Sequence, residues 1–154
     1  MCGIVGIFGQ AHNCDLMRVA EDMVASLVHR GPDDVGIWEN DEAQIALGHR
    51  RLSVLDLSHE GHQPMLSKDD RYVMVFNGEI YNHQLLREEL ESEKEVKWRG
   101  HSDTEVMLEA ISRWGIKRAL SKFIGMFAIA LFDRTERKLH LIRDRVGEKP
   151  LYYG

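Results

Sequence analysis

The chain begins MCGIVGIF (residues 1–8), a segment that alternates glycine with β-branched or aromatic residues. Such alternation predicts a β-strand whose glycines let another backbone or a ligand approach closely. Cys2 lies at the tip of that strand. If Met1 is removed, Cys2 carries a thiol and a free α-amine, and the amine is able to take the thiol proton. The alternative interpretation of Cys2 is a small buried hydrophobic residue at the start of a strand.

The composition indicates one globular domain with a substantial core, because 44% of the 154 residues are hydrophobic. A formal net charge of -5 argues against binding to nucleic acid or to an anionic membrane surface. The longest apolar stretch, residues 123–132, is too short to cross a membrane, and no charged and then apolar leader opens the chain. We therefore expect a cytoplasmic protein, in which Cys2 and Cys14 do not form a disulfide.

Hydrophobic periodicity predicts three helices. The first covers residues 16–28, with Asp15 as its N-cap and the Gly-Pro pair at residues 31–32 as its stop. The second begins at Asn82 and runs to about residue 93. The third begins at a capping box of the form S-x-x-E at residues 102–105 and runs to Gly115.

Short apolar runs bounded by turn residues predict antiparallel strands. They lie at residues 36–38, 45–47, 52–55 and 72–76, and residues 126–132 and 139–142 are typical of a hairpin. Strands, then helices, then strands again favour an α+β fold in which sheets pack on each other and are covered by helices.

Two charged segments are candidates for a site. Residues 29–34 bracket a rigid turn with charged groups, although cations on the dipole of a helix C-terminus are the simpler explanation. Arg50 and Arg51 stand directly before an apolar strand. Each guanidinium group is a planar fork that is able to grip a carboxylate, while solvated surface charge is the simpler interpretation.

Two polar segments are also candidates. Asn77 and Gly78 follow an apolar strand and offer an amide and a backbone N–H, the two donors that an oxyanion hole needs. An Asn-Gly pair is first of all a hairpin turn, but a helix follows here instead of a returning strand. The carboxylates of residues 102–105 stand at a helix start, where capping explains them, and Asp103 is also suited to meet a ligand ammonium.

Six ordered segments together resemble the glutaminase domain of glutamine-hydrolysing asparagine synthetase, over the entire chain. They are MCGIVGIF, VHRGPDDVG, GHRRLSVLDLS, FNGEIYNH, SDTE and RDRVGEKPLYYG. That domain is a class II glutamine amidotransferase with the N-terminal nucleophile fold. The resemblance implies a four-layer αββα sandwich of antiparallel sheets, in agreement with the α+β class expected above.

The resemblance implies catalytic roles for three residues. Cys2 matches the nucleophile that attacks the side-chain amide of glutamine, with its own α-amine as base and then as acid to the leaving ammonia. Asn77 and Gly78 match the oxyanion-hole positions.

The resemblance also implies a set of residues that bind the substrate. Arg51 matches the arginine that binds the glutamine α-carboxylate, and Glu79 and Asp103 match the acidic residues near its α-ammonium. Leu52 and Val54 complete the set of expected substrate contacts. No metal site is expected.

Residues 1–154 are therefore expected to form one glutaminase domain that is incomplete at its C-terminus. Family members continue into a synthetase domain, which binds ATP and Mg and makes asparagine from aspartate with the released ammonia. The partners implied are glutamine, that synthetase domain in the same chain or as a separate subunit, and a second copy in a homodimer. No cofactor is expected in this domain itself. The alternatives are a non-catalytic glutaminase-like fragment, or an amidotransferase with a non-aspartate acceptor in a polysaccharide pathway.

Two remaining patterns are given structural interpretations. His59 and His62 are close in sequence but lack the spacing of a zincin motif and lie in a Gly- and Pro-containing loop, so metal binding is not predicted. His101 and the three tryptophans are interpreted as structural and packing residues.

Overall fold

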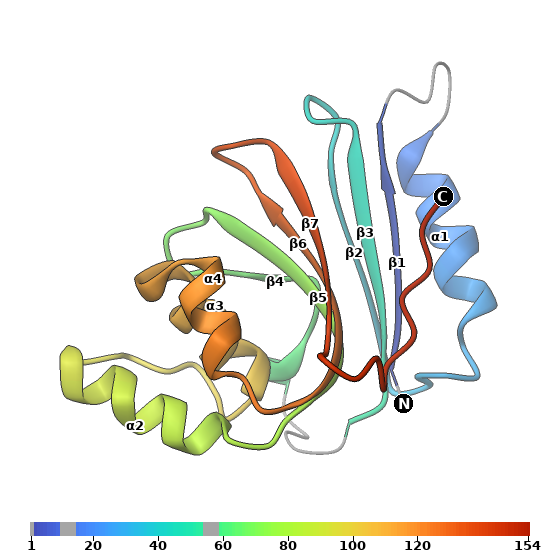
Figure 1. Ribbon diagram of the computed structural model, residues 1–154. Helices are drawn as coiled ribbons and strands as arrows, with labels where there is room; N and C mark the ends of the chain where they lie inside the picture. Colours follow the sequence, from blue (N-terminus) through green and yellow to red (C-terminus); the bar gives the residue numbers. More distant parts are fainter. Residues whose placement is uncertain (1, 10–14, 54–58) are drawn as a thin grey trace.

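The computed structural model describes residues 2–9, 15–53 and 59–154, which form two antiparallel sheets with helices on both outer faces (Figure 1). The elements in chain order are β1 (Gly3–Phe8), α1 (Leu16–Ser26), β2 (Asp34–Asn40), β3 (Ile45–Arg51), a 3-10 helix (His59–Gly61), β4 (Met65–Leu66), β5 (Tyr72–Ile80), α2 (His83–Glu93), α3 (Asp103–Trp114), α4 (Ile116–Lys122), β6 (Gly125–Asp133) and β7 (Lys138–Arg143).

The layers follow from the order of the strands. One sheet has the order β1-β3-β2 and the other the order β4-β5-β6-β7. Helix α1 covers the outer face of the first sheet, and α2, α3 and α4 cover the outer face of the second (Figure 1). This arrangement is the α+β sandwich with helix, sheet, sheet and helix layers that the sequence predicts.

Side-chain alternation along β3 decides what lies between the sheets. Ile45 and Leu47 are fully buried and pack against Val73 and Val75 of β5. Because successive side chains point to opposite faces of a strand, His49 continues this inner face, and so does the last residue of β3. The inner face of β3 is therefore apolar at one end and polar at the other.

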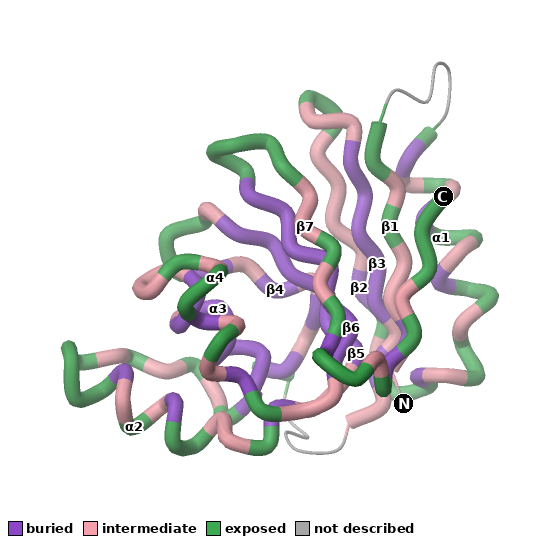
Figure 2. The backbone as a smooth tube through the Cα atoms, viewed as in Figure 1, coloured by how far each residue is buried: buried purple, intermediate pink, exposed green. Residues whose placement is uncertain are grey.

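Strands β5 and β6 are buried on both faces (Figure 2). In β5 the residues alternate between two clusters, with Val75 facing the first sheet and Met74 and Phe76 facing the helices. Cover on both sides explains why these strands appear in the sequence as continuous apolar runs.

Two of the three predicted N-caps act through their side chains. Asp15 accepts a hydrogen bond from the Arg18 backbone N–H (3.0 Å), and Ser102 accepts one from the Glu105 backbone N–H (3.3 Å). The capping box is only half formed, because the Glu105 carboxylate accepts from the backbone N–H groups of Arg99 and Gly100. It thereby fixes the segment that leads into α3.

Asn82 occupies the N-cap position of α2, but its side chain makes no capping hydrogen bond. Its amide donates to the Lys122 carbonyl (2.9 Å), and its side-chain oxygen accepts from the Ile124 backbone N–H (3.0 Å). Asn82 therefore joins the start of α2 to the connection between α4 and β6. Single-sequence capping rules do not include such a long-range partner.

Two strand predictions need correction. Strand β3 runs to Arg51, and Leu52 and Ser53 after it form no strand; the rest of the predicted strand lies outside the described residues. Strand β5 continues to Ile80, so Asn77 and Gly78 lie within it and not after it. Hydrogen bonding to β6 carries β5 past the end of the apolar run, because pairing partners cannot be found from hydrophobicity.

Among the described residues, no helix combines the length and the apolar character that a membrane span requires.

Replacing Phe132 with alanine should lower the free energy of unfolding by about 3–5 kcal/mol, because the ring fills the space between the sheets. Phe132 is 1% exposed, and its ring lies 5.9 Å from that of Trp38 and 6.0 Å from that of Phe8. Urea unfolding measures the change. Leu141→Ala, at a position on β7 that is 43% exposed, is the control and should change stability by less than about 1 kcal/mol. Equal losses in the two variants would contradict this packing.

Candidate active site

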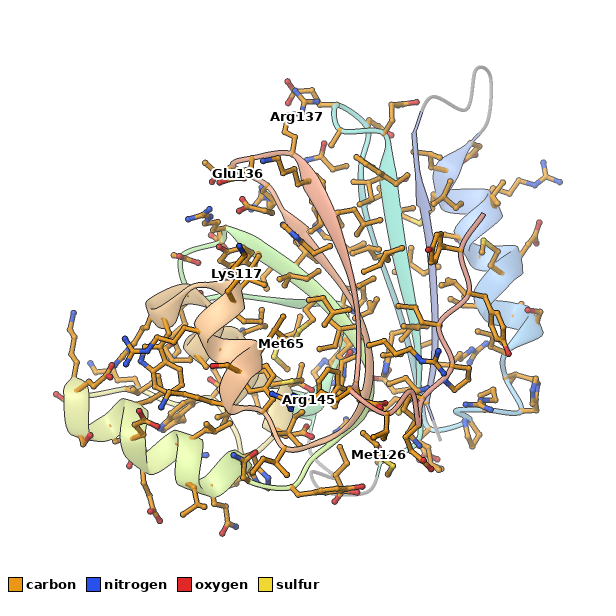
Figure 3. The ribbon with its side chains drawn as sticks, viewed as in Figure 1. Met65, Lys117, Met126, Glu136, Arg137 and Arg145 are labelled. Atoms are coloured by element: carbon orange, nitrogen blue, oxygen red, sulfur yellow. The ribbon has the colours of Figure 1, made fainter. Side chains whose placement is uncertain are left out.

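A cavity of about 220 Å³ opens at one end of the two sheets. The residues that line it come from the two sheets and their ends, from the turn around residues 61–63, from the start of α3 and from the C-terminal segment: Cys2, His49, Arg51, Leu52, Gly61, Gln63, Phe76, Asn77, Gly78, Glu79, Ser102, Asp103, Thr104, Met126 and Lys149. In Figure 3, Met126 marks the end of the sandwich at which the cavity lies, whereas Glu136 and Arg137 lie at the opposite end.

Cys2 stands next to the first residue after β3. Its Sγ lies 3.4 Å from the backbone nitrogen of Leu52 and 3.7 Å from the backbone oxygen of the same residue. The pairing of Gly3 with Arg50 in the first sheet brings the start of β1 to the end of β3. Cys2 is half-buried and its thiol is free of any disulfide; Cys14 lies outside the described residues.

The charged turn at residues 29–34 holds this end of β1 in place. The Arg30 guanidinium donates to the backbone oxygen of Cys2 (3.3 Å), and Asp33 accepts from the backbone N–H of Ser53 (2.8 Å). The turn is therefore more than the end of a helix, because it connects the residue before β1 with the segment after β3.

The two neighbouring arginines separate onto opposite faces of β3. Arg51 is 8% exposed and lines the cavity. Arg50 points to the other face, where its Nε donates to the Val24 carbonyl (3.0 Å) near the end of α1. Gly61 lies directly against the Arg51 guanidinium, and a Cβ at position 61 would overlap it. One arginine thus packs against α1, and the other lines the cavity.

Asn77 and Gly78 reach the cavity from the second sheet. Asn77 is 6% exposed. Gly78 is close to β6, where a Cβ would overlap the Met126 carbonyl oxygen and lie 2.7 Å from the Phe127 Cα. Only glycine allows the two strands to remain this close at the cavity, so its role here is close approach and not a turn.

Asp103 is a buried carboxylate at the first turn of α3. It is 6% exposed, and one of its oxygens accepts from the backbone N–H of Ile80 (3.0 Å), the last residue of β5. Burial raises the pKa of Asp103, and the hydrogen bond from Ile80 and the nearby His83 oppose the rise only in part. An ammonium group that entered the cavity would favour the ionised carboxylate.

Two residues of the cavity wall to which the sequence analysis assigns no role, Gln63 and His49, hold the backbone of Phe76, the residue before Asn77. The Phe76 backbone N–H donates to the Gln63 side-chain oxygen (2.7 Å), and the Phe76 carbonyl accepts from His49 Nε2 (3.2 Å). Gln63 also donates to the Thr104 hydroxyl (3.2 Å). These side chains fix β5 from three different parts of the chain, and only the tertiary structure reveals them.

His49 makes its contact as a neutral ring. It is 1% exposed, and burial is the main cause that lowers the pKa of His49 to about 4, against the opposing effects of the Phe76 carbonyl and Asp34. A neutral imidazole carries one N–H. Since the carbonyl is an acceptor, that proton belongs on Nε2.

The C-terminal segment closes another side of the cavity through Asp144. This buried carboxylate accepts from the backbone N–H groups of Phe127 (3.1 Å), Glu148 (2.8 Å) and Lys149 (2.9 Å). These bonds hold the loop so that Lys149, which is 6% exposed, lines the cavity. Burial acts to raise the pKa of Asp144, but the backbone hydrogen bonds outweigh it and lower the pKa to about 2.

The structure brings the described members of the predicted site together. Cys2, Arg51, Leu52, Asn77, Gly78, Glu79 and Asp103 all line this one cavity. Val54, the remaining predicted substrate contact, lies outside the described residues. The arrangement places a thiol nucleophile, hydrogen-bond donors, a guanidinium group and a buried carboxylate in one cavity, the kinds of group that acyl transfer from an amide uses.

Comparison with known proteins identifies the family of this chain and several similar proteins. A family described as the glutamine amidotransferase domain matches residues 1–154. Glutamine-hydrolyzing asparagine synthetase 1 of Bacillus subtilis (strain 168) is 42% identical over 156 residues, which cover 99% of this chain and 24% of that protein. Amidase chry2 of Gibberella zeae is 38% identical over 144 residues, which cover 92% of this chain and 21% of that protein.

A solved structure has the same fold. The glutamine phosphoribosylpyrophosphate amidotransferase of B. subtilis, in complex with ADP and GMP, matches with a TM-score of 0.72 at 22% identity, over 90% of this chain and 36% of that one. The chain belongs to the glutamine amidotransferase domain family, and it resembles the glutaminase domain of asparagine synthetases along its whole length. It spans about a quarter of the length of the B. subtilis synthetase.

Asp144→Asn should destabilise the protein by about 1.5–3 kcal/mol at neutral pH, because it removes the charge from the acceptor of four backbone hydrogen bonds. The folded-state pKa of Asp144 is depressed to about 2, so its stabilisation is complete above the unfolded value of about 3.9 and disappears as the pH falls through about 2. Denaturant unfolding at several pH values measures the difference between variant and parent.

That difference should be large at pH 7 and should shrink steadily between about pH 4 and pH 2. Asp22→Asn, at an exposed position of α1, is the matched control and should follow the parent at every pH. A difference of constant size over this range would show that the Asp144 charge is not the cause.

Proposed function

We propose that this chain hydrolyses glutamine to glutamate and ammonia, with Cys2 as the nucleophile. The observation that carries the proposal is that one cavity holds the Cys2 thiol together with Arg51, Asn77, Gly78 and Asp103, which come from both sheets and from α3. Membership of the glutamine amidotransferase domain family supports the choice of glutamine.

The cavity matches the functional groups of glutamine one by one. Arg51 offers a fork for the α-carboxylate, and its position against Gly61 restricts the directions in which the guanidinium is able to point. Asp103 and Glu79 offer negative charge to the α-ammonium. The side-chain amide would then lie toward Cys2 and the donors on β5. Rigid placement of both ends of a substrate is what makes such a reaction effectively unimolecular.

The chemistry proceeds in two steps. After removal of Met1, the α-amine of Cys2 takes the thiol proton, and the thiolate attacks the amide carbon of glutamine. The oxyanion that forms accepts hydrogen bonds from the Asn77 side chain and the Gly78 backbone N–H. The C–N bond then breaks, ammonia leaves with the proton from the α-amine, and a glutamyl thioester remains. Water attacks the thioester, which releases glutamate and restores the thiol.

The hydrogen bonds around Phe76 serve this mechanism. Gln63 and His49 hold the backbone N–H and the carbonyl of Phe76, and Asn77 follows directly. Donors that are fixed before the reaction need no reorganisation when the oxyanion forms. A reducing cytoplasmic environment, as the sequence predicts, would keep the Cys2 thiol available.

We further propose that the ammonia feeds a synthetase domain that makes asparagine from aspartate and ATP, with ATP and Mg²⁺ bound there and not in this domain. The similarity to an asparagine synthetase supports this assignment. The similar chain of amidase chry2 supports the alternative of a different acceptor, because the same kind of domain occurs in a protein with another name. The acceptor is chosen outside residues 1–154.

A glutamine analogue with a diazoketone in place of its amide should label Cys2, and only in molecules that have lost Met1. Intact-mass spectrometry followed by peptide mapping detects one added label. Cys2→Ala should abolish labelling, whereas Cys14→Ser, the matched control, should leave it unchanged. Labelling of a form that retains Met1, or of any other residue, would refute the proposed nucleophile.

The proposed roles of Arg51 on β3 and of Asn77 on β5 should affect different steady-state kinetic constants. Arg51→Ala should raise KM for glutamine with little change in kcat, because it removes a contact made in both ground and transition states. Asn77→Ala should lower kcat by about a hundredfold to a thousandfold, as loss of one oxyanion donor does.

The neighbour of Arg51 provides the control for this experiment. Arg50→Ala removes the same kind of side chain from the opposite face of β3, away from the cavity, and should leave KM for glutamine unchanged. If Arg50→Ala and Arg51→Ala raised KM equally, Arg51 would have no specific role in glutamine binding.

A further inference from the structure

A second cluster of reactive side chains lies behind the wall of the cavity. It consists of Asp34 at the start of β2 and of His59 and His62, which begin and follow the 3-10 helix. Asp34 Oδ2 lies 2.7 Å from His62 Nδ1, and the two imidazole rings are stacked with centroids 5.1 Å apart. One ligand atom from each of the three residues lies within 4.8 Å of the other two.

These distances suit a metal ion with short bonds. Two atoms bound to one Zn²⁺ at about 2.0–2.1 Å, in tetrahedral geometry, are about 3.4 Å apart. The widest pair of ligand atoms must therefore approach by roughly 1.4 Å, a movement that rotation of a side chain supplies. His59 is exposed and able to make this rotation. The 2.7 Å hydrogen bond between Asp34 Oδ2 and His62 Nδ1 is shorter than the ligand spacing, so it must open and release its proton for both residues to bind the ion.

The backbone around the cluster holds His62 in place. Gly36 of β2 lies so close that a Cβ there would be 2.7 Å from the His62 ring and would overlap the Gln63 carbonyl oxygen. Gly61, between the two histidines, lies against the Arg51 guanidinium. The turn is therefore packed on the side facing the protein, and His59 is exposed to solvent on the other side.

The ligand types select the ion. Imidazole nitrogen suits zinc and its neighbours among the transition metals, whereas magnesium and calcium prefer all-oxygen sites. Two histidines and one carboxylate with a fourth, open position form a common zinc arrangement. We propose that Asp34, His59 and His62 bind one Zn²⁺ ion, which joins β2 to the turn at residues 59–62.

The position of this site gives it a structural role. The ion would connect two segments that are 25 residues apart in the chain, and closing a long loop reduces the conformational freedom of the unfolded state. The same turn carries Gly61 and Gln63 to the cavity. The metal would therefore stabilise the wall against which Arg51 packs, and it binds independently of any glutamine hydrolysis.

Zinc titration of the metal-free protein tests the proposal, with isothermal calorimetry as the readout. A Cys2→Ala, Cys14→Ala background prevents either thiol from competing for the ion and is inactive by design, so the result does not depend on the proposed glutaminase activity. We expect one saturable site per chain. His59→Ala, His62→Ala and Asp34→Asn should each weaken binding by at least about tenfold.

His140→Ala is the matched control, because it removes a partly exposed histidine of β7 outside the cluster and should leave zinc affinity unchanged. Zn²⁺ should also raise the unfolding temperature of the background protein but not that of the His62→Ala variant. Far-UV circular dichroism establishes that each variant is folded. Absence of saturable binding, or binding that the three variants leave intact, would overturn the proposal.

Discussion

The packing of β3 against β5 is the contact on which the rest of this structure depends. Apolar side chains fill one half of the interface between the two sheets, and the cavity occupies the other half. The hydrogen bond from the buried, neutral His49 to the Phe76 carbonyl connects the sheets at the boundary between the two halves. Because Cys2 and Arg51 belong to one sheet and Asn77 to the other, any change in this spacing would separate the thiol from the donors proposed to assist it.

Local patterns were sufficient to predict much of the fold. The α+β class, the helices after Asp15 and Ser102 and the final hairpin follow from hydrophobic periodicity and capping, which depend on neighbours within a few residues. The helix α4 and the short strand β4 were not predicted, since α4 directly follows α3 and β4 has only two residues. The end of β5 was placed too early, because its last residues are held by pairing with β6 and not by their own hydrophobicity.

The candidate site, like the fold, was predicted only in part. The described residues that the family resemblance assigned to the substrate do line one cavity, since ordered motifs record which side chains a site requires. The contacts that support these residues were not found in this way. Gln63 and the Asp34 carboxylate act through partners that are 13 and 28 residues away in the chain, and no spacing rule connects such pairs. The separate roles of Arg50 and Arg51 became clear only from the faces of β3 that they occupy.

The contact of Gly61 with the Arg51 guanidinium has a consequence for redesign. Recognition of an amino-acid carboxylate is usually altered by exchanging charged groups, which also changes the electrostatic field of the whole pocket. Here a single added methyl group at residue 61 would overlap the Arg51 guanidinium and force it to shift. If Arg51 binds the substrate carboxylate as proposed, an alanine at residue 61 would alter that contact by steric means alone, with every formal charge of the pocket preserved.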